Sequence, residues 1–372
     1  MYDIAVIGAG INGCSIAYEL TQVGKSVLVL DKDGIASGGS GAAGAFISPK
    51  FSKAGELKEI IHNAFLYSME YYYHHFPQHF TQAQLLHLAK DEEEDITLNI
   101  YKQTTPLPLK VPSQTTLQTL SSFAKEREYV SIDAGVVDAP KMCQAMLQKA
   151  TFLQEEVISL KYKEEQWCIN EKYYAKKVVL AMGAYKTILD EPYIALRGVW
   201  GHRIDVETST CNPYSIHQFV SIAPSDDGVI AVGATHNVHY HPQKNKEPYN
   251  YDEGRAKLLK KASKTLNLKD VKVVRDYTGL RSGSFDYMPL VGPLVMSEET
   301  LTCKGKKLRI KKPNFEEFLY YPHLSMINGS GGYGFVLAPY LAKILKDFII
   351  DEKTISQRLV PARFFARWVK RK

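Results

Sequence analysis

Apolar positions near the start of the chain form two short continuous runs, separated by a glycine turn and a segment of mixed polarity. The first run, Tyr2–Ile7, leads into Gly8-Ala9-Gly10-Ile11-Asn12-Gly13, and the second run ends at Asp31. Short continuous apolar runs predict strands buried on both faces, and the segment between them predicts a helix. The order of strand, glycine turn, helix, strand and acid predicts a βαβ unit that binds a dinucleotide.

The residue types of this motif suit a dinucleotide for physical reasons. Gly8 permits the tight turn, Gly10 lets a pyrophosphate approach the backbone, and Gly13 lets the helix pack closely on the strand. The helix N-terminus offers N–H groups and a positive dipole to the phosphates, and Asp31 can accept hydrogen bonds from a ribose. The alternative is a glycine turn with a purely structural role.

The same kind of pattern predicts the other elements. It indicates a helix over 57–76, a buried strand over 176–180, a mostly antiparallel sheet between 197 and 275, a strand over 324–328 and a helix over 335–350. Residues 81–130 are polar and rich in proline, so we expect an irregular excursion there. The loop Ala36–Gly44 consists of small residues, which let a backbone lie close to a flat ligand.

Composition narrows the class of protein. At 372 residues the chain is long enough for two domains. It opens without the basic and apolar regions of a secretory signal, and no apolar stretch has the length of a membrane span. The five cysteines are scattered and form no CxxC pair, and the histidines show no HxxxH or HxH spacing on one credible helix. We therefore expect a cytoplasmic protein with reduced thiols and no metal site.

The net charge of +6 is unevenly distributed along the sequence. Lys304–Lys312 and Pro361–Lys372 are both strongly basic, and the second segment is also rich in aromatic residues. Two interpretations remain open for them. They form either a solvated edge and a frayed tail, or a surface that binds phosphates, as in nucleic-acid-binding proteins.

The chain resembles the glycine oxidase and D-amino-acid oxidase (DAO) superfamily of FAD enzymes along nearly its whole length. The landmarks occur in family order after the first glycine motif. They are the Ser-Gly-rich loop Ser37–Gly44, Gly135–Asp138, Val178–Ala184, Leu196–Gly198, Gly279–Arg281 with Asp286, Pro289–Pro293, and the glycine turn before Ala338-Pro339.

Within this superfamily, the chain is most similar to the oxidase domain of the MnmC family of bacterial tRNA-modifying enzymes. The similarity lies in Ser40–Lys50, Asn63–Ser68, Leu196–Gly198, Val232–Thr235 and the ending from Pro361 with its basic tail. The chain departs from that pattern at Ala42, where an asparagine is usual, and at Tyr333, where an arginine is usual. The methyltransferase domain of the bifunctional enzyme has no counterpart, so the resemblance implies a stand-alone oxidase.

The resemblance implies an α/β (α+β) fold, in which a Rossmann-like FAD-binding domain is interleaved with an antiparallel-sheet substrate domain. The expected FAD-binding domain comprises 1–80, 131–196 and 276–372, and the expected substrate-binding domain comprises 81–130 and 197–275. FAD is expected to be non-covalent, because no cysteine lies in Arg281–Pro289. The expected cofactor-binding residues are Gly8, Gly10, Ile11, Asn12, Gly13, Asp31, Lys32, Ser37, Gly38, Ser40, Gly41, Ala42, Gly44, Val157, Ala181, Gly183, Arg281, Gly331, Gly332, Tyr333 and Gly334.

Two of these residues, Arg281 and Tyr333, are also the expected catalytic residues. Arg281 matches the carboxylate-binding arginine of the glycine oxidase pattern, and a guanidinium can bind a carboxylate through two hydrogen bonds. A structural salt bridge is the alternative for it. The glycines around Tyr333 begin a helix whose N-terminus can stabilise negative charge on the flavin. His236 and Arg203 lie in the expected substrate sheet, where a satisfied surface histidine is the simpler interpretation.

The resemblance implies oxidation of a C–N bond, with a hydride passing to the flavin. The leading hypothesis is removal of the carboxymethyl group from 5-carboxymethylaminomethyl(-2-thio)uridine at the wobble position of tRNA, giving 5-aminomethyl(-2-thio)uridine and glyoxylate. The basic segments favour tRNA as the partner. The alternatives are an oxidase or dehydrogenase of free glycine, sarcosine or D-amino acids, and a flavin-binding subunit without turnover.

Overall fold

The computed structural model describes residues 1–185, 188–189, 191–305 and 313–371. Contacts divide the chain into two compact units, each built from separate stretches of sequence. Unit 1 comprises Met1–Gly38, Cys143–Gly198 and Arg281–Lys372, and unit 2 comprises Gly39–Met142 and Val199–Leu280. Each unit contains one sheet with its own hydrophobic core.

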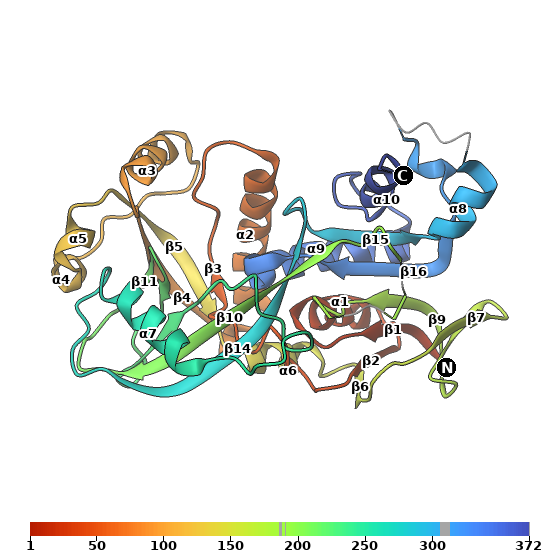
Figure 1. Cartoon of the computed structure of the whole chain (residues 1–372), viewed down its shortest axis with the longest axis horizontal. Coiled ribbons are helices and arrows are strands. Elements are labelled where there is room, and N and C mark those ends of the chain that lie inside the picture. Colours follow the sequence, from red (N-terminus) through yellow and green to blue (C-terminus); the bar gives the residue numbers. More distant parts are fainter. Residues whose placement is uncertain (186–187, 190, 306–312, 372) are drawn as a thin grey trace. The chain divides into compact units, whose positions relative to one another are not determined.

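Unit 1 is built on a mainly parallel sheet (Figure 1). Its strands, in spatial order, are β15 (Leu290–Val295), β16 (Tyr320–Asn328), β9 (Tyr173–Leu180), β1 (Tyr2–Ile7), β2 (Val27–Asp31) and β6 (Thr151–Gln154). The strands β7 (Leu160–Lys163) and β8 (Gln166–Ile169) extend from β9. Among the described strands of this sheet, the antiparallel pairs are β15–β16, β7–β8 and β8–β9. The helical segments of this unit are α1 (Ile11–Gln22), α8 (Ser297–Lys304), η3 (Phe315–Glu317), η4 (Gly331–Tyr333), α9 (Gly334–Asp351) and α10 (Ala362–Val369).

The central strands of unit 1 are apolar on both faces because other elements cover both faces. The helices α1 and α9 lie side by side; both contact β16, and α1 also contacts β1. Ile7, Leu28 and Leu180 belong to a buried cluster that also contains Trp167 from β8 and Phe365 from α10. Phe365 is fully buried, and burial of a side chain of this size contributes roughly 1.5–3 kcal/mol. The sequence pattern of continuous apolar runs therefore reflects a sheet without a solvated face.

The order of these strands creates a switch point at the carboxyl edge of the sheet. From β1 the chain passes through α1 to β2 on one side, whereas β9 and then β16 pair in parallel on the other side of β1. Open α/β sheets bind ligands outside the carboxyl ends of the strands at such a point. Gly8, which follows β1, and Ala181, which follows β9, lie at this position.

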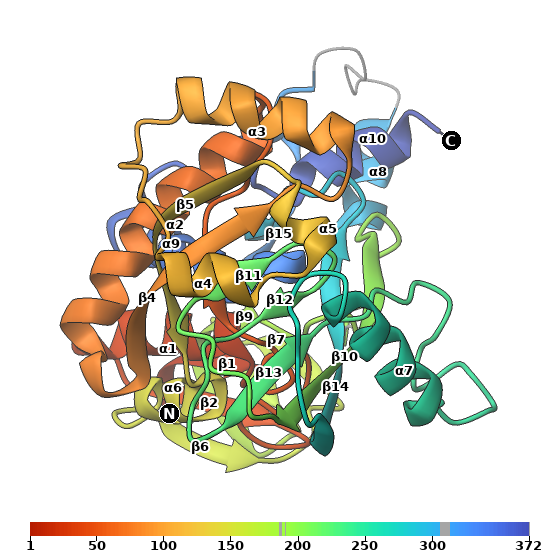
Figure 2. The same ribbon diagram turned by 90° about the vertical axis from the view of Figure 1, so that its left-hand side faces the viewer.

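Unit 2 is built on a mostly antiparallel sheet (Figure 2). Its strands, in spatial order, are β14 (Lys272–Ser284), β10 (Leu196–Glu207), β13 (Val229–Gly233), β12 (Ser221–Ile222), β11 (Ser215–His217), β4 (Phe80–Leu88), β5 (Tyr129–Val137) and β3 (Phe46–Ile47). The pairs β10–β13, β13–β12, β12–β11, β4–β5 and β5–β3 are antiparallel, whereas β11 and β4 pair in parallel. The helical segments are α2 (Glu56–His75), η1 (Pro77–His79), α3 (Glu92–Thr104), α4 (Gln114–Thr119), α5 (Ser122–Lys125), α6 (Ala139–Met146, which continues into unit 1) and α7 (Tyr251–Ala262).

One face of this second sheet forms a hydrophobic core with helices. Ile204 and Val232 from neighbouring strands pack in a cluster that includes Leu258 of α7 and Ala124 of α5. Side chains of the opposite alternation, among them His87 and His217, project from the other face. Unit 2 therefore has one apolar face and one face with polar groups.

The expectation that residues 81–130 are irregular is wrong. The segment contains β4, α3, α4, α5 and the start of β5. Capping side chains begin each of the helices: Asp91 accepts a hydrogen bond from Glu94 N–H, Ser113 from Thr116 N–H and Ser121 from Ala124 N–H. Capping satisfies N–H groups that a helix leaves unpaired, so polar, proline-interrupted sequence can still contain short helices.

The unit boundaries also differ from the expected ones. Residues 39–80 and 131–142 belong to unit 2 instead of the FAD-binding part, because β3 and β5 pair with each other and β5 pairs along the whole of β4. Of the two interpretations left open for the C-terminal segment, the frayed tail is wrong, since α10 extends to Val369. Of the basic segment 304–312, residues 306–312 lie outside the described residues. No helix in the described part of the chain is long and apolar enough to cross a membrane.

Candidate active site

Two glycines fix the geometry at the switch point of unit 1. Gly8 has a φ of +107°, and a Cβ atom on it would lie 2.4 Å from the Ala181 carbonyl oxygen. A Cβ on Gly13 would lie 1.9 Å from the Gly8 carbonyl oxygen. Both distances are far below van der Waals contact, so only glycine lets α1 begin this close to the ends of β1 and β9.

The N-termini of two helices meet beside this turn. Gly10 precedes α1, whose first turn contains no acidic residue, and the Ser330 hydroxyl donates to Asn12 Oδ1 at 3.1 Å. A Cβ on Gly334, the first residue of α9, would lie 3.3 Å from the Ile11 side chain. Two positive helix ends in one place form an environment that suits an anionic group such as a pyrophosphate.

Asp31 is held in a fixed orientation at the end of β2. Its carboxylate accepts hydrogen bonds from Ala9 N–H at 2.8 Å and from Asp33 N–H at 3.0 Å. The Ser37 hydroxyl lies 3.5 Å from the same carboxylate, and exposed Lys32 places its ammonium 5.6 Å from the Tyr185 ring. The carboxylate is thus tied to the glycine turn, where it can receive a ribose hydroxyl.

Three further expected cofactor residues of unit 1, Gly38, Val157 and Gly183, lie in different surroundings. Gly38 is in ordinary contact distance of Tyr185, at 3.8 Å for a Cβ placed on it. Val157 lies beyond the carboxyl end of β6, where its half-buried side chain packs against the core of unit 1. Gly183, with a φ of +64°, follows β9 at the carboxyl edge.

Asn328 is a site residue that reasoning from sequence missed. It ends β16, is 1% exposed, and its amide nitrogen donates to the Gly183 carbonyl at 2.9 Å. Its amide oxygen accepts from Gly329 N–H and from the Ser282 hydroxyl, both at 2.8 Å. One buried side chain therefore joins the loop after β9, the glycine turn and the end of β14. A polar residue at the end of a continuous apolar strand was the available signal.

Arg281 and Tyr333 come from elements that these bonds hold together. Arg281 precedes Ser282 on β14, and an isolated β-bridge pairs Gly283 with Ser330, three residues before Tyr333. Burial lowers the pKa of the Arg281 guanidinium and raises the pKa of the Tyr333 hydroxyl to about 12. At neutral pH the tyrosine is neutral and the arginine remains a cation. A cation in a poorly solvated place gains most from an anionic ligand.

The Ser-Gly-rich loop of unit 2 contains the other expected cofactor residues, Ser40, Gly41, Ala42 and Gly44, all half-buried. Ala43 N–H donates to the Ser40 carbonyl at 3.2 Å, and the Ala43 carbonyl accepts from Arg203 Nη1 at 3.0 Å. A Cβ on Gly44 would lie 2.5 Å from the Phe46 ring, so this position also requires glycine.

Arg203 and His236 occupy different environments within unit 2. The Arg203 guanidinium lies 3.9 Å from the centre of the Tyr277 ring while it holds the Ala43 carbonyl, so within this unit it positions the loop. His236 is exposed.

The polar face of the unit 2 sheet carries a histidine pair that reasoning from sequence missed. His87 and His217 are partners in the register of β4 and β11, with ring centres 6.4 Å apart. Phe51 stacks on His87 at 4.2 Å, and Phe46 meets His217 edge-on at 4.9 Å. Burial lowers the pKa of His87 well below its ordinary value and that of His217 to about 4, so both rings are neutral at pH 7.

The described residues include no cluster of three or more His, Cys, Asp or Glu side chains able to hold a metal ion. FAD fits the geometry of unit 1. The glycine cradle that a Cβ would fill, the paired helix N-termini and the oriented Asp31 carboxylate provide what a pyrophosphate and a ribose need.

Comparison with known proteins agrees with this geometry. MnmC, the bifunctional tRNA 5-methylaminomethyl-2-thiouridine biosynthesis protein, is 26% identical in Dichelobacter nodosus (strain VCS1703A) over 98% of this chain. Its counterpart in Legionella pneumophila (strain Philadelphia 1) is 23% identical over 97% of this chain. The chain spans only 58% and 57% of the length of these two relatives.

Solved structures share the fold. Glycine oxidase from Bacillus cereus ATCC 14579 has a TM-score of 0.75 at 20% identity, covering 95% of this chain and 96% of that one. L-α-glycerophosphate oxidase from Mycoplasma pneumoniae, whose structure contains FAD, has a TM-score of 0.71 at 14% identity, covering 94% of both chains. The family described as DAO, FAD dependent oxidoreductase, matches residues 3–348. The chain therefore belongs to the DAO family of FAD-dependent oxidoreductases, and its cofactor is FAD.

Proposed function

We propose that this oxidoreductase acts on a secondary amine that bears a carboxymethyl group, attached to the wobble uridine of tRNA. The product would be the aminomethyl uridine, released together with glyoxylate. The observation that carries this proposal is the half-buried Arg281 beside the glycine turn of unit 1, which provides a cation for the substrate carboxylate. Relatives named for tRNA 5-methylaminomethyl-2-thiouridine biosynthesis support RNA as the carrier of that amine.

The proposed step balances as follows. A C–H bond of the carboxymethyl methylene carbon breaks and its hydrogen leaves as a hydride with both bonding electrons, while the nitrogen releases its N–H proton to water and forms a C=N bond to the same carbon. Water then adds to this imine, and cleavage of the C–N bond gives the primary amine and glyoxylate. FAD, when bound, supplies the two-electron acceptor for this chemistry.

The chain's own residues would orient the substrate for this step. Arg281 would bind the carboxylate through two hydrogen bonds and so fix the adjacent carbon. The N-terminus of α9 would stabilise negative charge that develops near Gly331–Gly334. Tyr333, neutral at physiological pH, would contribute a hydroxyl and an aromatic surface without acting as a base.

Oxidation of free small amino acids is the second candidate, because the same cation would bind glycine or sarcosine. The fold shared with glycine oxidase is compatible with it. Under this alternative the flavin would be reduced by small amines and not by the modified tRNA.

Anaerobic reduction of the flavin distinguishes the two candidates. The purified protein is mixed with tRNA that carries 5-carboxymethylaminomethyluridine, and separately with glycine, sarcosine and D-alanine, while flavin absorbance is recorded. We expect bleaching by the modified tRNA and none by tRNA that lacks the carboxymethyl group. Bleaching by the small amines alone would refute the tRNA proposal.

A further inference from the structure

The loop that follows β14 exposes two large aromatic side chains in unit 1. Phe285 is 64% exposed and Tyr287 is 61% exposed, whereas Met288 and Leu290 beside them are buried. Exposure of single apolar residues is common in soluble proteins, but two aromatic rings two residues apart form a local patch. Phe285 follows Arg281 by four residues, so their Cα atoms are at most about 14 Å apart.

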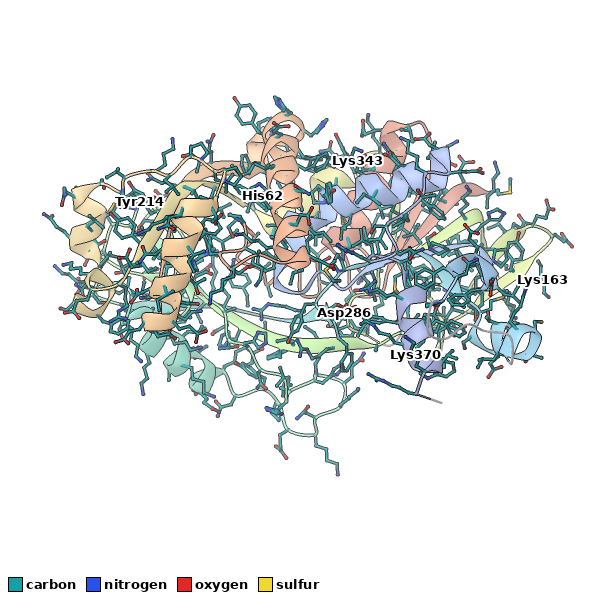
Figure 3. All side chains as sticks on the ribbon, turned by 90° about the horizontal axis from the view of Figure 1, so that it is seen from above. His62, Lys163, Tyr214, Asp286, Lys343 and Lys370 are labelled. Atoms are coloured by element: carbon teal, nitrogen blue, oxygen red, sulfur yellow. The ribbon has the colours of Figure 1, made fainter. Side chains whose placement is uncertain are left out.

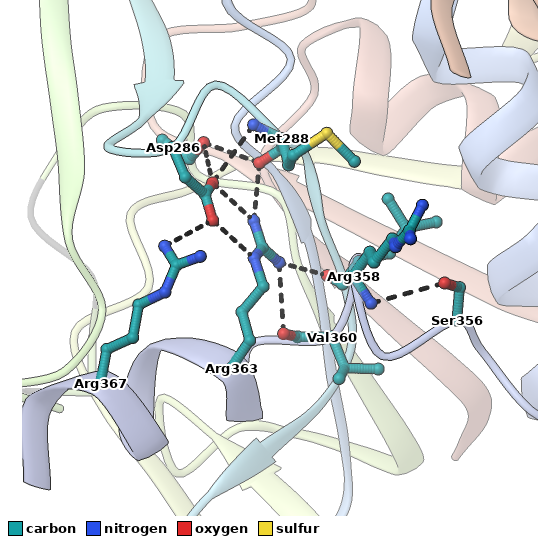
Figure 4. A network of polar contacts seen from close by, with 9 residues as sticks. Asp286, Met288, Ser356, Arg358, Val360, Arg363 and Arg367 are labelled. Atoms are coloured by element: carbon teal, nitrogen blue, oxygen red, sulfur yellow. Dashed lines mark hydrogen bonds and ion pairs between the residues drawn. The ribbon is translucent and has the colours of Figure 1, made fainter. Parts of the chain in front are cut away.

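A buried ion pair between Asp286 and Arg363 holds this loop in place (Figure 4). The Arg363 side chain of α10 is 8% exposed and binds the carboxylate of Asp286 with Nε and Nη2, both at 3.0 Å. The same guanidinium donates to the Met288 carbonyl at 2.8 Å. Burial opposes ionisation of Asp286, but the hydrogen bonds and charge of Arg363 outweigh it and lower the pKa of Asp286. The residue between the two exposed rings is therefore fixed.

Tyr287 is held in a conformation that costs energy. Its φ of +63° lies in the left-handed region, which non-glycine residues seldom adopt and which surrounding contacts must enforce. The Arg197 guanidinium lies 5.0 Å from the centre of its ring. With a cation against one face and 61% of the residue exposed, the ring has a free surface for a further stacking partner.

Two arginines lie beside this loop, since Arg197 faces the Tyr287 ring and Arg367 binds Asp286 between the two rings. Arg367 is 55% exposed at its side chain and bonds Asp286 at 2.8 Å. Lys370, labelled in Figure 3, and Arg371 are exposed at the end of α10. Because Asp286 is one carboxylate between Arg363 and Arg367, the local charge is positive even before Lys370 and Arg371 are counted.

From these observations we infer that Phe285 and Tyr287 form a stacking platform for unpaired bases of an RNA loop, with Lys370 and Arg371 contacting its phosphates. Aromatic rings that accept bases, next to cations that accept the backbone, are how proteins bind single-stranded nucleic acid. The inference rests on the proposed function, because it identifies the RNA-binding surface next to the candidate carboxylate-binding residue.

Binding of a fluorescent anticodon stem-loop RNA, followed by anisotropy, tests the platform independently of turnover. The double variant Phe285→Leu/Tyr287→Leu keeps apolar volume and removes both rings, and we expect binding to weaken by about tenfold or more. Tyr287→Phe alone retains the ring and should bind within about twofold of the unmodified protein. Tyr73→Leu, at a tyrosine of α2 that is 59% exposed, is the matched control and should leave binding unchanged.

The dependence of RNA binding on salt concentration distinguishes the contribution of the rings from that of the cations. The double ring variant should keep the slope of log affinity against log salt, whereas Lys370→Gln/Arg371→Gln should make it shallower by about 1.4. Lys260→Gln/Lys261→Gln on α7 is the charge control and should leave the slope unchanged. Flavin content and thermal midpoint of every variant establish that it is folded.

Each outcome has a defined meaning. If the unmodified protein binds and oxidises modified tRNA while the double ring variant binds equally well, the platform is refuted and the proposed function stands. If the unmodified protein does not bind the RNA at low salt, the platform is refuted, and the proposed function is refuted with it only if the modified tRNA also leaves the flavin oxidised. If the rings instead join two copies of the chain, sedimentation will show a dimer that the double variant dissociates with RNA binding unchanged, which also refutes the platform.

Discussion

Replacement of Arg363 by alanine should destabilise unit 1 far more than the same change at Arg367, although both side chains bind Asp286. Arg363 is 8% exposed at its side chain and Arg367 is 55% exposed. Loss of Arg363 removes two charge-assisted bonds from a carboxylate that is 18% exposed, and it leaves the carbonyls of Leu359, Val360 and Met288 without this donor.

The expected magnitude follows from burial. Breaking a buried ion pair by removing one partner typically costs 3–5 kcal/mol, so we expect a loss of about 3 kcal/mol, because Arg367 and Ser284 still bind the carboxylate. An exposed pair contributes about 0–1 kcal/mol, which is the expectation for Arg367→Ala. The direction in which this stabilising contribution changes with pH also follows from the structure. Since the pKa of Asp286 is lowered by folding, its stabilising contribution is present at neutral pH and is lost as pH falls below about 4.

Urea unfolding at neutral pH, followed by circular dichroism, measures these differences. Arg363→Ala should lower the free energy of unfolding by about 3 kcal/mol relative to the unmodified protein, and Arg367→Ala by less than about 1 kcal/mol. Equal losses in the two variants would show that burial does not set the strength of this pair, and the bracing of the 285–287 loop would lose its basis.

Further predictions concern the cofactor, the substrate and pH. Gly13→Ala, whose methyl group would lie 1.9 Å from a carbonyl oxygen, should lower FAD affinity by at least about tenfold. Gly332→Ala, whose methyl group would meet nothing within 4 Å, should leave the thermal midpoint of the apoprotein unchanged. Arg281→Ala should abolish flavin reduction by a carboxymethyl amine in stopped-flow measurements, and Arg281→Lys should retain a small part of it. His217 has a pKa of about 4 against an ordinary 6.5, so the unfolded chain binds an extra proton between these values and stability rises with pH across them. His217→Gln should flatten this rise when urea midpoints are compared at about pH 4.5 and about pH 7.

Much of the unit 1 site could be predicted from sequence because its constraints are local. Gly8, Gly13 and Asp31 lie within one βαβ unit, and their roles depend on a turn, a helix start and a strand end that follow each other along the chain. The clash distances at Gly8 and Gly13 show that only glycine fits at these positions, so the residue type itself indicates the tight turn. Local chemistry of this kind can be recognised without knowing the tertiary structure.

The residues that were missed depend on contacts between distant segments. Asn328 joins Gly183 and Ser282, which are far apart in sequence, and nothing near Asn328 indicates those partners. His87 and His217 become neighbours only because β4 and β11 pair in parallel, a pairing that their own sequences do not specify. Similarly, β5 was separated from β4 in the expected domain limits because strand pairing, and not composition, decides where a unit ends.

The basic C-terminal segment shows why a charge count alone overstates a binding surface. Pro361–Lys372 contains five cationic side chains, and five phosphate contacts to single-stranded RNA would give a salt slope of about −3.5. Arg363 and Arg367 bind Asp286, so Lys370 and Arg371 are the exposed cations of this segment that Asp286 does not bind within the described residues. Two phosphate contacts from these two side chains would give a slope of about −1.4. The two arginines are not lost to recognition, however, because the carboxylate they bind fixes the loop that exposes Phe285 and Tyr287. Arg363 and Arg367, which the sequence suggests as phosphate-binding cations, thus order the loop that carries the aromatic rings. A measured salt slope of about −1.4 instead of about −3.5 would support this assignment.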